Sequence, residues 1–256
     1  MKFYNPNIEI EIYPSSQMQL LKLYVSISLI LYFAYSPSEI TAQTIPNVEV
    51  SKKQLIFSDN FENGLDTLLW ISEIEPLPAS TTSVENGKLI LNTRGGVTVW
   101  LNILLKGNIE IEYSRKVIVN KNTNDRLSDL NQFWMAKDPK KSNLFTRQGK
   151  FEEYDNLLLY YVGMGGNTNT TTRFRKYTGN GERSLLKEYK DSAHLLRGDH
   201  EYQIRILVSD NTVNFYVDNV CYFTYRDASV LKEGYFGFRS TYSHQEIDNV
   251  KIYQLD

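Results

Sequence analysis

Short runs of alternating apolar and polar residues, each followed by a turn signal, recur from residue 55 to the end of the chain. In NIEIEYS (108–114) the isoleucines and the tyrosine would face one side of a strand and the glutamates the other. Asn86-Gly87 stands between two such runs and is the strongest short signal for a β-hairpin. The sequence shows no alternation of strand and helix patterns. We therefore predict an all-β fold, an antiparallel β-sandwich.

The domain organisation is simple. After residue 54 the sequence contains no internal repeat and no low-complexity linker, which predicts one domain over residues 55–256, preceded by a polar lead-in over 43–54. Two segments, 127–136 and 183–196, could each hold a turn or two of helix. The single cysteine, Cys221, lies in an apolar run, where we expect a small buried core residue.

The N-terminal region has the order of a secretory signal. An apolar stretch runs from Leu20 to Tyr35 with one early lysine, and small residues follow up to Ala42. We expect a signal peptide over residues 1–42, with Met18 as an alternative start, because MQLLKL would open an ordinary signal. The stretch is shorter than the ~20 apolar residues of a membrane span. We therefore expect cleavage, an exported periplasmic or extracellular protein, and no membrane span in its mature form.

Charge and composition limit the kinds of partner and cofactor that we expect. The net charge is −2, so no basic surface is indicated and we expect no nucleic-acid partner. One cysteine and three histidines without zinc-type spacing predict no intrachain disulfide, no cofactor and no metal site, although a structural Ca²⁺ near Asp59 and Asp248 stays open. The loop GMGGN (163–167) lacks the lysine and serine or threonine of a phosphate-binding loop. We expect a monomer.

Both ends of the predicted domain carry familiar motifs. Phe57-x-Asp59-x-Phe61, followed later by ENGKLIL, and the closing block GYFGFRSTYSHQEIDNVKIYQL resemble secreted concanavalin A-like jelly rolls. The middle, NDRLSDLNQFWMAKDP with GKFEEYDNLLLYYVGMGGNTNTTTRFRKY, resembles a bacterial family of that superfamily associated with degradation of pectin-like, rhamnose- and uronate-containing polysaccharides. The resemblance covers roughly residues 55–255. It implies a jelly roll with a groove on its concave sheet face, and an exported carbohydrate-active protein acting on a polysaccharide or oligosaccharide.

The stretch YYVGMGGNTNTTTRFRKY (160–177) holds the strongest candidates for a site. Arg173, Arg175 and Tyr177 alternate along a predicted strand, so they would share one face. Two arginines on one face are costly to bury without partners. Either carboxylates pair with them, for which the sequence offers Asp129, Asp138 and Asp155, or an anionic ligand such as a uronate does.

An acidic saccharide predicts lyase chemistry. β-Elimination from a uronate needs its carboxylate neutralised, and then a base and an acid, roles that suit tyrosine and histidine. We therefore predict a polysaccharide lyase. Its predicted catalytic residues are Tyr160, Tyr161, His244 and Arg173, and its predicted substrate-binding residues are Asn131, Trp134, Tyr154, Asn167, Asn169, Arg175, Tyr177 and Arg239.

Two alternatives stay open. A glycoside hydrolase would use paired carboxylates, for which Glu152, Glu153 and Asp155 are available. The E-x-D-x-x-E strand that the resemblance to glucanases would imply is missing from FEEYDNL. A non-catalytic carbohydrate-binding module would instead stack Trp100 or Trp134 on sugar rings without chemistry.

Overall fold

A computed structural model of the chain describes residues 52–119 and 123–256. The predicted signal peptide and nearly all of the lead-in lie outside the described residues. Within the part described, no helix is long and apolar enough to cross a membrane. The elements are β1 (Lys53–Asp59), β2 (Trp70–Ile74), β3 (Thr81–Glu85), β4 (Lys88–Lys106), β5 (Ile109–Ile118), β6 (Leu130–Lys137), η1 (Phe151–Tyr154), β7 (Leu158–Gly165), α2 (Gly166–Asn169), β8 (Thr171–Thr178), β9 (Arg183–Tyr189), η2 (Ser192–His194), β10 (Glu201–Ser209), β11 (Thr212–Val217), β12 (Val220–Arg226) and β13 (Glu233–Leu255).

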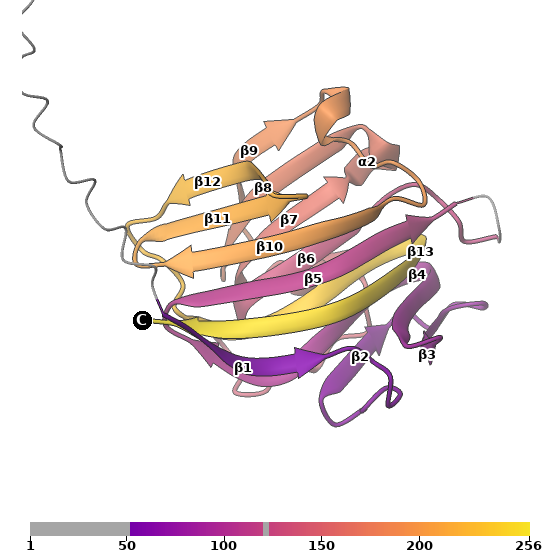
Figure 1. Ribbon diagram of the computed structural model, residues 1–256, viewed down its shortest axis with the longest axis horizontal. Coiled ribbons are helices and arrows are strands. Elements are labelled where there is room, and N and C mark those ends of the chain that lie inside the picture. The colour runs from indigo at the N-terminus through magenta and orange to yellow at the C-terminus, as the bar shows by residue number, and fades with distance from the viewer. Residues whose placement is uncertain (1–51, 120–122) are drawn as a thin grey trace, which may run out of the picture. The chain divides into compact units, whose positions relative to one another are not determined.

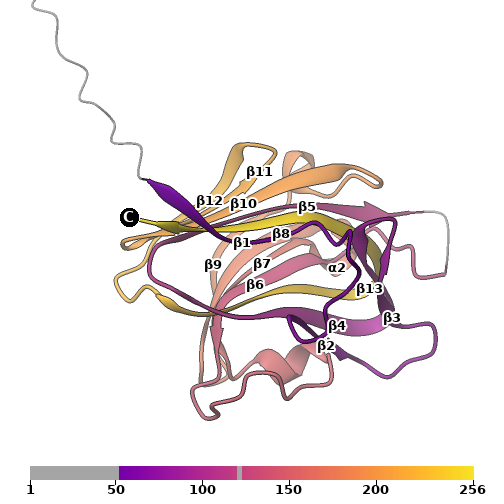
Figure 2. The ribbon, with the colours of Figure 1, turned by 60° about the horizontal axis from the view of Figure 1, so that its bottom comes forward.

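Two layers of antiparallel strands face each other (Figures 1 and 2). One, the β5 layer, runs β12-β11-β10-β5 and continues through the second half of β13 to β1 and the first half of β4. The other, the β7 layer, runs β9-β8-β7-β6 and continues through the first half of β13 to the second half of β4 and β2. The predicted all-β antiparallel sandwich is confirmed.

The long strands β4 and β13 bend from one layer into the other. The register between them shifts between Thr241 and Ser243, and Tyr242 has a positive φ of 45°. Opposite the bend, Gly96 has no room for a side chain, since a Cβ there would lie 2.0 Å from the Gly149 carbonyl oxygen and 2.7 Å from Arg239 Nη2. A bulge and a glycine are the usual means of turning a strand around the corner of a sandwich.

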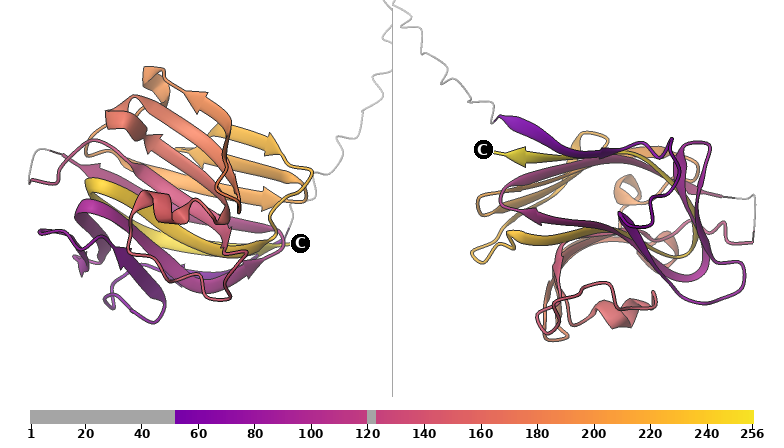
Figure 3. Two further views of the ribbon diagram at one scale, coloured as in Figure 1. Left: turned by 180° about the vertical axis from the view of Figure 1, so that it is seen from behind. Right: turned by 90° about the horizontal axis from the view of Figure 1, so that it is seen from below.

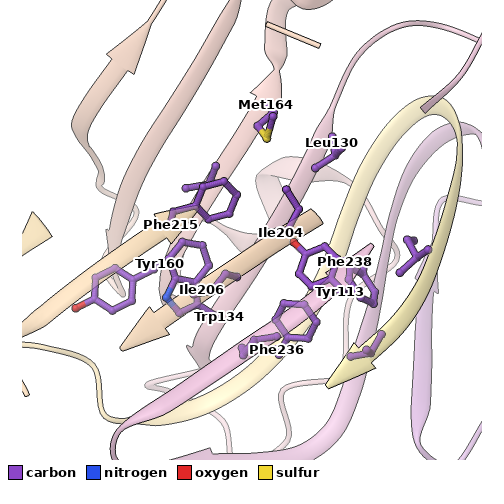
Figure 4. Close-up of a cluster of buried hydrophobic side chains, with 14 of the residues drawn as sticks. Tyr113, Leu130, Trp134, Tyr160, Met164, Ile204, Ile206, Phe215, Phe236 and Phe238 are labelled. Atoms are coloured by element: carbon purple, nitrogen blue, oxygen red, sulfur yellow. The ribbon is translucent and has the colours of Figure 1, made fainter. Parts of the chain in front are cut away.

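Aromatic side chains fill the space between the layers (Figure 4). The Trp134 ring, fully buried, stacks on Phe174 at 5.8 Å and on Phe215 at 6.2 Å between ring centroids. Tyr113 and Phe238 meet edge to face at 5.0 Å. Such large rings supply most of the apolar area that the two layers bury against each other.

A second apolar cluster lies on the other side of the β7 layer. There, the connection over residues 138–157, which we call the cover segment, packs against that layer, and Figure 3 shows it with η1 in front of the strands. Its members from the strands include Trp100, Phe133 and Tyr177, and Tyr154 comes from the cover segment itself. This outer face is therefore apolar over part of its area, and the face expected to form an open groove is partly covered.

Two local expectations are wrong. Residues 127–136 and 183–196 are mostly strand, as β6 and β9, and only η2 is helical. Cys221 is exposed, because a register shift between Phe215 and Tyr216 changes which residues of β12 face the core.

Candidate functional site

Several predicted site residues lie on the outer face of the β7 layer. Tyr161 pairs with Arg175 across β7 and β8, and Gly163 pairs with Arg173 and, on the other side, with Asn131 of β6. Residues at opposed positions point to the same face of a sheet. Tyr177 joins this face through its contact with the Tyr161 ring, 6.1 Å away. The prediction that Arg173, Arg175 and Tyr177 share one face is confirmed.

Arg173 has a carboxylate partner that the sequence did not suggest. Its Nε donates to Glu188 Oε1 at 2.5 Å, and Glu188 stands directly opposite on β9. With its amide oxygen turned toward β8, Asn167 accepts from Arg173 Nη1 and Nη2 at 3.1 and 3.2 Å.

The three predicted carboxylates are engaged elsewhere: Asp129 with Arg126, Asp138 with Arg147, and Asp155 with Arg183. The expectation that they pair with Arg173 is corrected, since β9 was not predicted as a strand.

Arg175 is held more loosely. Its Nη1 donates to the Arg183 carbonyl oxygen at 3.1 Å, and its side chain is half-buried. Within residues 52–119 and 123–256 it forms no ion pair with a carboxylate. Most of its hydrogen-bonding capacity is therefore free for an anionic group.

Arg239, on the first half of β13, is 1% exposed and also forms no carboxylate ion pair with the described residues. Nη1 donates to the Gly149 carbonyl oxygen, and the guanidinium lies over the rings of Phe151 and Tyr154 at 5.3 and 5.2 Å. Burial lowers the pKa of Arg239. A buried guanidinium held by a carbonyl and aromatic faces is incompletely compensated.

Unpaired polar atoms gather on this face. Asn131 Oδ1 and Arg239 Nε are buried and have no hydrogen-bond partner among the described residues. The Tyr161 hydroxyl also makes no hydrogen bond to any described residue. A Cβ on Gly163 would lie 2.1 Å from that hydroxyl and 2.7 Å from Asn131 Oδ1, so both groups meet above the glycine. Since nearly all buried polar groups are paired in folded proteins, this group of atoms marks a place for a polar ligand.

The electrostatics of Tyr161 follow from its position. Burial raises the pKa of the Tyr161 phenol, nearby Tyr177 and Asp129 raise it further, and Arg239 and Arg175 oppose the shift. The phenol is therefore protonated at neutral pH. An anionic ligand bound beside the arginines would meet a proton-bearing group.

The cover segment is anchored by a buried carboxylate. Glu73 on β2 is 4% exposed, and its Oε2 accepts from Trp100 Nε1 at 2.8 Å and from the Tyr154 hydroxyl at 2.9 Å. Its Oε1 accepts from the Arg147 backbone N–H at 2.7 Å. Burial raises the pKa of Glu73. Tyr154, predicted to bind substrate, is thereby a buried support of the cover segment, which corrects that prediction.

Four other predicted residues do not reach this face: Trp134, Tyr160, Asn169 and His244. Trp134 and Tyr160 occupy the alternate positions of β6 and β7 and point into the core, where the Tyr160 hydroxyl donates to Asp227. Asn169 is tied to the backbone of Leu196 at 2.8 and 2.9 Å.

His244 follows the bend in β13 and lies on the outer side of the β5 layer, where it pairs with Asp125 at 3.0 Å. The prediction that these side chains line one site is corrected, because strand alternation and the bend separate them.

Sequence reasoning missed Gly163, Phe151 and Gly149. The last two come from the cover segment, which has no periodic pattern, and Gly163 was considered within the loop GMGGN and not as a site residue. Strand parity within YYVGMGG was the one signal that could have placed Gly163 beside Tyr161.

Comparison with known protein families identifies the family of this chain. The family described as a domain of unknown function (DUF6250) matches residues 91–250, more than half of the chain. The chain belongs to this family. The DUF6250 region spans most of β4 through most of β13, and so includes Asn131, Tyr161, Arg175 and Arg239. No curated protein matches the chain.

Solved structures share its fold. A Bacillus subtilis protein of unknown function with a galectin-like fold is 15% identical, with a TM-score of 0.65 over 80% of this chain and 98% of its own. An endo-β-1,3-glucanase from Pyrococcus furiosus is 11% identical, with a TM-score of 0.60 over 81% and 97%. The carbohydrate-binding module CBM66 from Bacillus subtilis is 15% identical, with a TM-score of 0.52 over 73% and 96%. At these identities the likeness establishes the fold alone, and the predicted jelly-roll β-sandwich is confirmed.

Proposed function

We propose that this DUF6250 protein is carbohydrate-active, binds a uronate-containing saccharide on the outer face of the β7 layer, and cleaves it by β-elimination. The observation that carries the proposal is the arrangement of Arg175 and Arg239, without carboxylate partners among the described residues, beside the unpaired Asn131 and Tyr161. The fold relatives, which include a carbohydrate-binding module and a glucanase, support a saccharide as the ligand. The signal-like segment 1–42 supports export.

Recognition would fall to the guanidinium of Arg175. A planar guanidinium can hold a carboxylate with two parallel hydrogen bonds, and this neutralisation acidifies the proton on the adjacent sugar carbon. Asn131 and Arg239 lie on the same face with unused hydrogen-bonding atoms for the carboxylate or a neighbouring hydroxyl.

Proton transfer would fall to Tyr161. Of the two tyrosines at 160 and 161, only Tyr161 faces the arginines. Its phenolate takes the proton from C5, the C4–C5 double bond forms as the C4–O bond breaks, and the phenol returns the proton to the leaving oxygen. Since the pKa of free Tyr161 is raised, this step should become faster as the pH rises into the alkaline range.

Hydrolysis by paired carboxylates is less well supported. On or beside this face Glu188 is paired with Arg173, Asp129 with Arg126, and Asp155 with Arg183. Glu73 is enclosed by the cover segment. Each of these carboxylates would have to leave its partner before it could act as an acid or nucleophile.

Binding without chemistry is the second candidate. One observation favours it: the raised pKa of Tyr161 leaves little phenolate at neutral pH. The protein would then hold an acidic saccharide through Arg175 and release it unchanged.

One experiment separates the candidates. The mature protein is incubated with rhamnogalacturonan, ulvan and gellan over a range of pH, while the ultraviolet absorbance of unsaturated uronate and the number of reducing ends are followed. We expect both to rise together, faster at alkaline pH. New reducing ends without ultraviolet absorbance would replace the lyase with a hydrolase. Binding of a polymer without any product would leave the binding function alone.

A further inference from the structure

A second buried arginine supports the proposed site from inside the sandwich. Arg115 lies on β5, in the opposite layer, and its side chain is wholly buried. Its Nη1 donates to the Asn131 carbonyl oxygen at 2.6 Å and its Nη2 to the Arg239 carbonyl oxygen at 2.9 Å. Its Nε donates to Gln245 Oε1 at 2.7 Å.

The two carbonyls belong to residues that form a cross-strand pair. Asn131 and Arg239 are directly opposed across β6 and β13, and theirs is the last pair before these strands separate at the bend. Their side chains both belong to the proposed site, on the face away from Arg115. The planar guanidinium of Arg115 therefore hydrogen-bonds to the backbone of both residues at the last pair of the β6–β13 ladder.

The cost of this arrangement points to a function beyond packing. Arg115 forms no ion pair with a carboxylate in the described part of the chain, and burial lowers its pKa to about 10, so it is still charged at neutral pH. A buried charge without a counter-charge is a poor source of stability. An apolar residue of similar volume could fill this space, but it would leave both carbonyl oxygens unpaired and could not fix their spacing.

We propose that Arg115 is a positioning residue that sets the spacing of Asn131 and Arg239 for recognition of the uronate. This inference rests on the proposed function of the outer face of the β7 layer. Arg115 lies on the inner side of the β7 layer, and Tyr161 faces the outer side. The loss of Arg115 should therefore weaken substrate binding and leave the chemical step of the bound complex nearly intact.

The test compares Arg115→Lys with Tyr222→Phe. Lysine keeps the charge but cannot span both carbonyls. Tyr222→Phe is the matched control, because it removes a hydrogen bond of another buried side chain in the same layer, from the Tyr222 hydroxyl to the Ala193 carbonyl oxygen at 3.1 Å, and lies on β12, three strands away from β5. For each protein we would measure the melting temperature, the Kd for digalacturonate and the kcat and KM on the polymer cleaved by the wild type, well below the melting transition.

We expect Arg115→Lys to raise Kd and KM about tenfold or more, since moving Asn131 and Arg239 apart weakens a charged hydrogen bond to the uronate, with kcat little changed. Tyr222→Phe should lower the melting temperature and leave Kd and KM unchanged. Equal Kd and KM for wild type and Arg115→Lys would overturn the positioning role. So would an equal loss in both variants, which would show a general effect of stability.

If Arg115→Lys does not fold, the structure of the wild-type protein with digalacturonate decides. The inference requires the saccharide to contact Asn131 and Arg239 while Arg115 holds both carbonyls, and a saccharide bound elsewhere on the protein contradicts it. Failure of the proposed function would be seen separately, as a wild type that neither binds nor cleaves any uronate.

Discussion

Replacing Arg175 by methionine should remove affinity for an acidic saccharide without unfolding the protein. Methionine keeps an apolar stem like that of arginine but lacks the charged guanidinium. The native arginine is half-buried and makes one hydrogen bond, to the Arg183 carbonyl oxygen at 3.1 Å. A substitution at such a position changes the free energy of unfolding by about 0.5 kcal/mol or less.

The loss of affinity can be estimated. Hydrogen bonds to charged groups contribute about 1.5–3 kcal/mol each. Since about 1.4 kcal/mol corresponds to a factor of ten, Arg175→Met should raise the Kd for a uronate oligosaccharide about 10- to 100-fold. Part of this difference should disappear at high salt, because exposed charges are screened there.

Isothermal titration calorimetry on both proteins checks this value, with Arg205→Met as the control. Arg205 is also a partly exposed arginine, 3.8 Å over the Tyr216 ring, but it lies on the β5 layer and pairs with Glu110. The control should bind as the wild type does. If Arg175→Met bound the oligosaccharide as tightly as the wild type, Arg175 would not be the carboxylate receptor, and the reasoning from its missing partner would be refuted.

Four further substitutions test other parts of the account. Tyr161→Phe should reduce the rate of unsaturated product formation by about 10²–10⁴ and leave oligosaccharide affinity unchanged, and an active variant would remove Tyr161 from the chemistry. Gly163→Ala should displace the Tyr161 hydroxyl and lower kcat about a hundredfold, whereas unchanged kcat would show that the close approach has no role. Glu73→Gln tests pH dependence. Because burial raises the pKa of Glu73, its contribution to stability is present below about pH 4 and is lost as the pH rises through its folded pKa. The melting temperature of the variant relative to the wild type should therefore increase from pH 4 upward, and a constant difference would contradict this. His244→Gln should cost about 1 kcal/mol of stability through its bond to Asp125 and leave the rate unchanged, and a large rate loss would return His244 to the catalytic set.

Much of the strand pattern could be predicted from local signals. Asn86-Gly87 forms the expected hairpin turn between β3 and β4, with φ values of 52° and 68°. Asp218-Asn219 does the same between β11 and β12, with φ values of 49° and 66°. These residues tolerate positive φ, so the turn is encoded within two positions. The bend of β13 at Tyr242 depends on packing between the two layers, and no local sequence pattern predicts it.

The site could be predicted only in part. Parity placed Arg173, Arg175 and Tyr177 on one face, because it depends on the strand alone. Parity could not choose between Tyr160 and Tyr161, since both faces of β7 are apolar once the cover segment packs on the outer one. Arg239 reaches its neighbours through pairing with β4 and β6, which are distant in sequence, and neither strand encodes that register. Glu188 reaches Arg173 across the consecutive strands β8 and β9, and it was missed because the sequence did not predict β9 as a strand.

The central claim is that the outer face of the β7 layer recognises a carboxylate on a sugar. The most direct measurement is a calorimetric titration of the wild-type protein with digalacturonate and with the same disaccharide after both carboxyl groups have been reduced to alcohols. We expect binding of the acid and a Kd at least about tenfold higher for the reduced sugar, which loses the charged hydrogen bonds. Equal affinity for both sugars would contradict it.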